Sequence, residues 1–152
     1  MVVDTSALVA ILSDEPERHA FNQIIEAASV RLISAGTVLQ AGLVIEARKG
    51  EYGGRELDLF LHRARFEVVP VDADQVEAGR AACRVYGKGR HAAGLNFGDC
   101  FAYALAKLRG EPLLHKGGAF ALTDLAGIPG FAVPKGAAPI TLAQTLATED
   151  EE

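Results

Sequence analysis

The sequence contains little cysteine, and its two cysteines lie far apart. Cys83 and Cys100 form neither a CxxC pair nor any spacing typical of a zinc site, so a disulfide scaffold and a structural zinc site are not expected. We interpret both residues as reduced thiols in a cytoplasmic protein.

Long apolar runs and an excess of basic charge are also missing. No run approaches the roughly 18 residues that a membrane-spanning helix needs, and the first residues lack the basic segment of a signal peptide. The 15 basic and 20 acidic residues give a net charge of -5, which argues against a general polyanion-binding protein. Of the 152 residues, 49% are hydrophobic, enough for the core of one domain.

Short apolar segments alternate with helical patterns along the chain. Strands are expected at residues 1–3, 31–34, 66–71 and 112–115, with 130–133 as a further candidate. Helices are expected at residues 6–12, 16–28, 35–48, 57–65, 73–85 and 99–109, with a polar, glycine-rich turn at 49–54. This alternation predicts an α/β fold with a central, mostly parallel sheet. The helical residues expected in its core include Val38, Leu39, Leu43, Val44, Ile45, Phe101, Ala104, Leu105 and Leu108.

Asp4 and Asp99 stand at junctions between elements. Asp4 follows the first strand, and the functional groups of parallel sheets gather at the carboxyl ends of strands. Asp99 follows a glycine-containing loop, where a helix begins. Each residue fits a helix-capping role, and together they fit a site for Mg²⁺, which takes oxygen ligands.

Three segments of the sequence resemble the PIN-domain family. VVDTSAL, LNFGDCFAYALA and LLHKGGAFALTDL are similar to segments of PIN domains, and more narrowly of the VapC toxins of bacterial toxin–antitoxin pairs. We assign residues 1–135 to a PIN-like domain and 136–152 to a C-terminal extension that is expected to be partly flexible. The resemblance implies a central parallel sheet, Mg²⁺-dependent endoribonuclease chemistry and inhibition by a small antitoxin protein encoded nearby.

The resemblance also implies a set of site residues, from which this chain departs at two positions. The family's first and third acidic positions fall on Asp4 and Asp99, which we predict to be catalytic and to bind Mg²⁺, or Mn²⁺, weakly. The second falls on Gln40 in SAGTVLQ and the fourth on Ala119 in KGGAF. Asp124 matches a further acidic position and is also predicted to be catalytic, although with Thr123 it equally fits a helix cap.

The two departures weaken the predicted metal site. Gln40 offers a neutral oxygen, and the side chain of Ala119 offers no ligand. Glu46 cannot substitute for Gln40, because six helical residues turn its side chain by about 240°. Two hypotheses therefore remain open: an endoribonuclease of reduced activity, and a non-catalytic PIN domain that binds RNA or an antitoxin. A receiver-like signalling domain is disfavoured, because Asp4 has no acidic neighbour.

A basic stretch without any acid precedes Asp99. Residues 80–98 contain no Asp or Glu, and phosphate contacts from such a stretch would give RNA affinity without sequence preference; a solvated surface is the alternative. We predict RNA binding by Arg84, Lys88, Arg90 and His91. We also expect Lys116 to reach the same site. Phe97 and Tyr103 are expected to pack in the core, with stacking on a ligand as the alternative.

Protein partners are expected at the helices before Gly54. Apolar helix faces there can pair two copies into a homodimer or hold an antitoxin helix. The expected partners are therefore an RNA substrate, a cognate antitoxin protein and a second copy of the chain.

Overall fold

A four-stranded parallel sheet forms the centre of the molecule. This computed structural model describes residues 1–128. Strands β1 (Val2–Val3), β2 (Leu32–Ser34), β3 (Glu67–Val69) and β4 (Leu113–Leu114) lie in the order β3-β2-β1-β4. Val2 pairs with Leu32 on one side and Leu113 on the other, and all three strand pairs are parallel. The expected α/β fold is confirmed.

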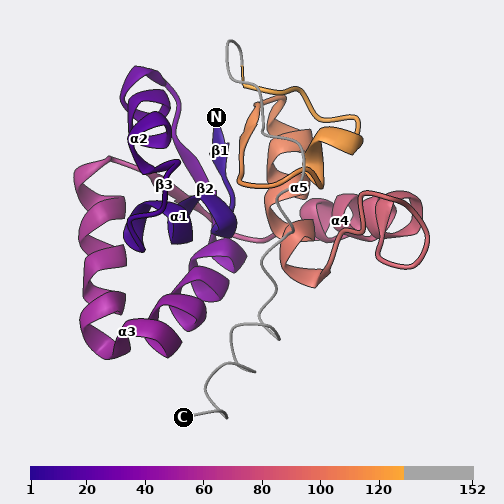
Figure 1. Ribbon diagram of the computed structural model, residues 1–152. Helices are drawn as coiled ribbons and strands as arrows, with labels where there is room; N and C mark the ends of the chain where they lie inside the picture. The colour runs from indigo at the N-terminus through magenta and orange to yellow at the C-terminus, as the bar shows by residue number, and fades with distance from the viewer. Residues whose placement is uncertain (129–152) are drawn as a thin grey trace.

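The helices cover both faces of the sheet. They are α1 (Thr5–Leu12), α2 (Arg18–Ala27), α3 (Ala35–Arg63), α4 (Ala73–Tyr86) and α5 (Phe97–Arg109), followed by a 3₁₀ turn, η1 (Phe120–Leu122). Figure 1 shows α1, α2 and α3 on one side of the strands and α4 and α5 on the other. No helix in residues 1–128 is long and apolar enough to cross a membrane.

Successive strand residues contribute to two separate cores. Val3, Ile33 and Leu114 pack with α1, α2 and α3, whereas Val2 and Leu113 pack with α4 and α5. Because neighbouring side chains of a strand point to opposite faces, even a two-residue strand serves both cores. The central strand β1 and its neighbour β4 are fully buried, and a strand buried on both faces has no polar side, which explains why both are entirely apolar.

Helix α3 consists of two helical arms that meet at a kink, so the expected break between two helices lies within the predicted turn at 49–54. Only Gly50 has non-helical backbone angles, with φ 65° and ψ −163°, and this positive φ favours glycine. Gly53 and Gly54 stay helical and lie against the first arm of the helix. A Cβ on Gly53 would lie 2.7 Å from Ile45 Cγ2, and one on Gly54 would lie 2.6 Å from Glu46 Oε1. The glycines therefore allow a sharp bend with close packing of its two arms.

Some residues expected in the core are exposed. Val44 and Ile45 are buried against Val9, but Leu39 and Leu43, on another side of α3, are 65% and 50% exposed. Leu108 of α5 is also 50% exposed, and Phe97 is 82% exposed. The apolar stripe of α3 is wider than the face of this helix that packs on the core. A prediction from periodicity alone therefore assigned too many of its residues to the core. The candidate strand at 130–133 and the proposed extension lie outside the described residues.

Candidate active site

Asp4 caps a helix with one carboxylate oxygen and leaves the other without a donor. It lies between β1 and α1 and is 3% exposed. Its Oδ2 accepts hydrogen bonds from the backbone N (3.0 Å) and the Oγ (2.7 Å) of Ser6. Its Oδ1 is buried and has no hydrogen-bond partner within the described chain. Capping thus uses half of the carboxylate, and the other half is available to a ligand.

Asp99 also has a capping role, in the first turn of α5. Asp99 N donates to Asn96 Oδ1 and Asn96 N donates to Asp99 Oδ2, both at 3.0 Å, which forms a capping box. This pair explains why α5 begins at Phe97, two residues before the predicted start. The Asp99 side chain is held in one orientation, with the residue only 8% exposed.

The two carboxylates lie near enough to affect each other's titration. Burial raises the pKa of Asp99, and the charge of Asp4 raises it further, to about 7. Burial likewise raises the pKa of Asp4, although hydrogen bonds from Ser6 and Thr5 oppose this effect. Two buried carboxylates that destabilise each other's charged form are stabilised by a shared cation. The structure thus brings Asp4 and Asp99 together at the carboxyl end of β1.

Gln40 contacts the residue that follows Asp4 and the residue that precedes Asp99. Thr5 Oγ1 donates a 2.7 Å hydrogen bond to Gln40 Oε1. On the other side, a Cβ on Gly98 would lie 1.9 Å from Gln40 Nε2, so only glycine allows this approach. The residue at the family's second acidic position therefore reaches the candidate site, but its oxygen already accepts a hydrogen bond.

The loop after β4 connects to Asp4 through Ser6. Lys116 N donates to Ser6 Oγ at 2.9 Å, and this hydroxyl donates in turn to Asp4 Oδ2. The Lys116 ammonium is paired with Glu15 and, at 3.3 Å, with Glu17, and hydrogen bonding to Glu15 is the main reason that its pKa is raised. We predicted that the Lys116 side chain reaches into the site. Instead, its ammonium group holds the loop between α1 and α2 through Glu15 and Glu17.

Ala119 lies on the same loop and contributes no polar atom. Its side chain packs against the apolar cluster that includes Phe120 and Tyr103. Within residues 1–128, no group of three or more His, Cys, Asp or Glu side chains is arranged to hold a metal ion. The acidic pair is thus supported by amide and hydroxyl groups rather than by further carboxylates.

Asp124 has two partners on α5. Its Oδ1 accepts from the Tyr103 hydroxyl at 2.6 Å, and its Oδ2 accepts from Lys107 Nζ at 2.5 Å. These hydrogen bonds, the one from Lys107 first, lower the pKa of Asp124. Tyr103 and Lys107 follow Asp99 by one and two helical turns, so the Asp124 carboxylate is bound further along α5. Its catalytic role remains a prediction.

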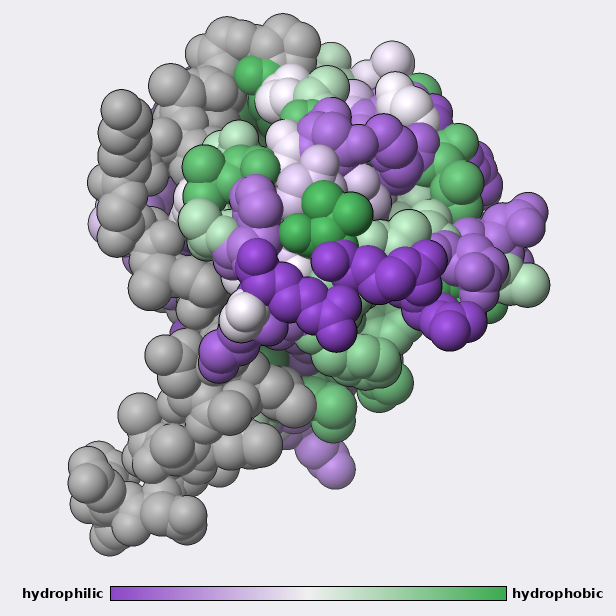
Figure 2. All heavy atoms as spheres, turned by 90° about the vertical axis from the view of Figure 1, so that its right-hand side faces the viewer, coloured by the Kyte–Doolittle hydropathy of each residue, from purple (hydrophilic) through white to green (hydrophobic). Residues whose placement is uncertain are grey.

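The basic residues predicted to bind RNA are exposed on α4 and the loop that follows. Arg84 lies in the last turn of α4, and Lys88, Arg90 and His91 lie in the loop. Hydrophilic side chains gather across this side of the molecule (Figure 2). The His91 ring packs edge-on against Tyr86, with centroids 5.1 Å apart, and its Nδ1 accepts a 3.0 Å hydrogen bond from Ala93 N.

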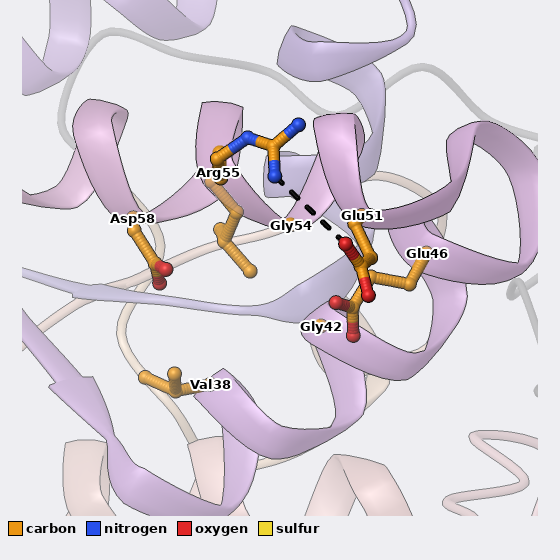
Figure 3. Close-up of a pocket in the computed structure, with 8 residues that line it drawn as sticks. Val38, Gly42, Glu46, Glu51, Gly54, Arg55 and Asp58 are labelled. Atoms are coloured by element: carbon orange, nitrogen blue, oxygen red, sulfur yellow. Dashed lines mark ion pairs between the residues drawn. The ribbon is translucent and has the colours of Figure 1, made fainter.

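A separate cavity of about 350 Å³ lies within the bend of α3. Figure 3 shows Glu46, Glu51 and Asp58 around it, with Arg55 paired to Glu51 at 3.9 Å. All its lining residues belong to α3. Glu46 therefore lies at this cavity, whereas Gln40 contacts Thr5 and Gly98.

Two hydroxyl residues of the site were missed by the sequence analysis. Thr5 positions Gln40, and Ser6 links Asp4 to Lys116 N. The only signal in the sequence was their place directly after Asp4 in VVDTSAL.

Comparisons with known proteins assign the chain to a class. Residues 1–125 match the family described as the PIN domain, and the chain belongs to this family. It is 61% identical over 128 residues to ribonuclease VapC30 of Mycobacterium tuberculosis (strain H37Rv), covering 84% of this chain and 98% of that protein. It is 59% identical to ribonuclease VapC of Mycolicibacterium smegmatis, covering 84% and 99%. The similarity within the PIN family is therefore to VapC ribonucleases, and the resemblance seen in the sequence is confirmed.

Solved structures agree with the fold. VapC20 of Mycobacterium tuberculosis, described as a sarcin–ricin-loop-cleaving toxin, superposes with a TM-score of 0.68 at 17% identity, covering 82% of this chain and 95% of that one. A toxin–antitoxin complex from Klebsiella pneumoniae gives 0.61 at 23% identity, covering 90% and 98%. At these identities the likeness establishes the PIN fold alone.

Proposed function

We propose that this chain is a VapC-type, metal-dependent endoribonuclease whose metal site is weakened. The buried pair of Asp4 and Asp99 carries this proposal, together with the relatives that are named VapC ribonucleases. Burial raises the pKa of both carboxyl groups, and Asp4 Oδ1 has no donor among the described residues. An oxygen-preferring divalent ion fits this donor set, because it would satisfy the free oxygen and offset the repulsion.

Each residue of the site has a defined part in this proposal. Asp4 and Asp99 would hold Mg²⁺ or Mn²⁺, which when bound supplies an activated water and shields phosphate charge. Ser6 fixes the orientation of the Asp4 carboxylate, and Asn96 fixes that of Asp99. Gln40, held by Thr5, can orient a water or substrate hydroxyl but adds no negative charge.

The substrate that we propose is RNA, held by the exposed basic residues before α5. Arg84, Lys88 and Arg90 can contact phosphates without reading the base sequence. Because these residues lie outside the acidic site, RNA binding does not depend on a complete set of metal ligands.

The test is to restore the two missing carboxylates. The double variant Gln40→Glu with Ala119→Asp should cleave RNA at least about 10-fold faster than the unmodified chain in Mg²⁺, because even an outer-shell partner is typically worth 10–100-fold. Either single change should restore less, since groups around one metal act as a unit. The control is to add Asp4→Asn to the double variant, which preserves the shape of the site and should abolish cleavage.

An unmodified chain that cleaves as fast as the double variant would show that another group already completes the site. The second candidate function is a non-catalytic RNA- or antitoxin-binding PIN domain, favoured by Gln40 and Ala119 at the acidic positions. If both proteins bind RNA but neither cleaves it in Mg²⁺ or Mn²⁺, this second function is the correct one.

We also propose two protein partners. Two structural neighbours are a toxin–antitoxin complex from Klebsiella pneumoniae and VapBC2 from Rickettsia felis, which supports a cognate antitoxin for this chain. Leu39 and Leu43 lie about one turn apart on α3 and are 65% and 50% exposed. They offer an apolar surface for a second copy in a homodimer.

A further inference from the structure

Phe97 has an exposure that the fold does not explain. It is 82% exposed, the highest fraction among the large hydrophobic residues found exposed in the described part of the chain. Phe97 belongs to none of the core clusters in residues 1–128, whereas Ala102 and Leu105 of the same helix are buried in one. The ring therefore contributes little to the core and is accessible to a ligand.

The direction of the ring is set by its contacts. Phe97 packs edge-on against Phe101, with ring centroids 5.1 Å apart and planes at 80°. Phe101 in turn lies against Gly36, where a Cβ would be 2.4 Å from the Phe101 ring. The absence of a side chain at Gly36 lets Phe101 approach α3, and Phe101 supports Phe97 from one side. One face of a supported, exposed aromatic ring is a stacking surface.

The ring lies at the edge of the acidic site. Phe97 is two residues before Asp99 in the first turn of α5, and Gly98 between them contacts Gln40. The preceding stretch, residues 80–98, contains no acid and leads from the basic loop to this ring. Lys88 N donates to Leu95 O at 3.0 Å, so the basic loop folds back to the residues just before Phe97, and an RNA backbone bound there would have its bases near this ring.

We propose that Phe97 stacks on an unpaired nucleobase of the RNA substrate, beside the phosphate that lies at Asp4 and Asp99. The inference rests on the proposed function in taking RNA as the substrate and Asp4 and Asp99 as the site of its phosphate. Stacking of a base on an aromatic side chain is tolerant of sequence, so Phe97 positions the strand rather than selecting one base. The exposure of Phe97 thus favours the ligand-stacking alternative over the core packing expected from the sequence.

The experiment uses a fluorescence reporter that the sequence makes unambiguous. The chain contains no tryptophan, so Phe97→Trp introduces the only one. An unstructured single-stranded RNA, added with a chelator to prevent cleavage, should quench this tryptophan. The matched control is Tyr52→Trp, since Tyr52 is 65% exposed on α3 and should not be quenched. An abasic strand of the same length keeps the phosphates, and it should bind without quenching Phe97→Trp.

Affinity provides the second measurement. Phe97→Ala should raise the Kd for the unstructured RNA about 5- to 150-fold, the equivalent of one stacked base, and leave the Kd for the abasic strand unchanged. Circular dichroism should show an intact fold, because the side chain is exposed. Equal Kd values for wild type and Phe97→Ala would overturn the inference, as would equal quenching by normal and abasic strands.

A second copy of the chain is the competing occupant. If emission of Phe97→Trp shifts with protein concentration in the absence of RNA, and sedimentation shows that Phe97→Ala dissociates a dimer, the ring is buried between copies and the inference is wrong. Quenching without cleavage by the double variant would leave the stacking role intact and refute only the catalytic proposal. Cleavage that does not depend on Phe97 would refute only the stacking role.

Discussion

Replacing Asp99 by Asn should stabilise the metal-free protein at neutral and alkaline pH. Burial and the charge of Asp4 raise the pKa of Asp99 from 3.8 to about 7. Between these values the folded protein keeps a proton that the unfolded chain has released, so stability falls as pH rises through this window. A difference of about three pH units corresponds to about 4 kcal/mol, an upper limit because Asp4 shares the coupling.

This loss of stability at high pH is large compared with the free energy of unfolding of a typical domain, roughly 5–15 kcal/mol. Asn keeps a side-chain oxygen that can accept the hydrogen bond from Asn96 N, so the helix cap of α5 is preserved. We expect Asp99→Asn to be more stable than wild type at about pH 8. Between about pH 5 and pH 8, its free energy of unfolding should decline much less than that of wild type.

Urea denaturation followed by circular dichroism, in a chelator at both pH values, measures this difference. Mg²⁺ should stabilise the wild type at the higher pH by binding only the folded state, and should have little effect on Asp99→Asn. Asp58→Asn, which removes an exposed carboxylate of α3, is the matched control and should behave as wild type in Mg²⁺. A wild type whose stability is the same at both pH values without metal would refute the reasoning about the acidic pair.

Two further predictions concern the surroundings of the pair. Ser6→Ala should destabilise the fold by about 1–3 kcal/mol in denaturant titrations, because Lys116 N loses its acceptor and Asp4 loses a donor; a conservative Ser6→Thr should recover part of the loss, and an unchanged midpoint for Ser6→Ala would contradict the proposed role of the hydroxyl. Simultaneous substitution of three basic residues by Ala should weaken RNA binding across sequences and reduce the slope of log K against log salt by about 0.7 for each phosphate that the variant no longer neutralises; salt-independent affinity would show only a solvated surface at Arg84, Lys88 and Arg90.

The elements of the fold were predictable where local sequence dominates. The alternation of apolar strands with helices predicted the parallel sheet, and the strand positions agree within a few residues. The break of α3 at Gly50 lies within the predicted turn, but Gly53 and Gly54 were also assigned to that turn, because both are typical of a turn when read alone. They remain helical because their missing side chains make room for Ile45 and Glu46 on the other arm, an arrangement that becomes visible only in three dimensions.

The charged residues of the candidate site were predictable from the sequence, but the hydrogen bonds that position them were not. Asp4 and Asp99 could be placed together because each follows an element that ends at the same edge of the sheet. The bond from Thr5 to Gln40 spans 35 residues, and the bond from Lys116 to Ser6 spans 110. No local pattern encodes such long-range bonds. The exposure of Phe97 was missed for a related reason, since an aromatic residue beside a buried helix face is usually in the core.

The two acids that this chain retains are those that also cap helices. Asp4 Oδ2 closes the start of α1, and Asp99 closes the start of α5 with Asn96, so each carboxylate also has a role in folding. Gln40 and Ala119, by contrast, contribute no cap bond in the described structure. Carboxylates there would add repulsion to a pair whose pKa values are already raised, so only a bound cation makes them favourable. Capping does not explain the buried Asp4 Oδ1, which has no partner among the described residues, and recovery of cleavage on restoring the other two carboxylates is the decisive observation for catalysis.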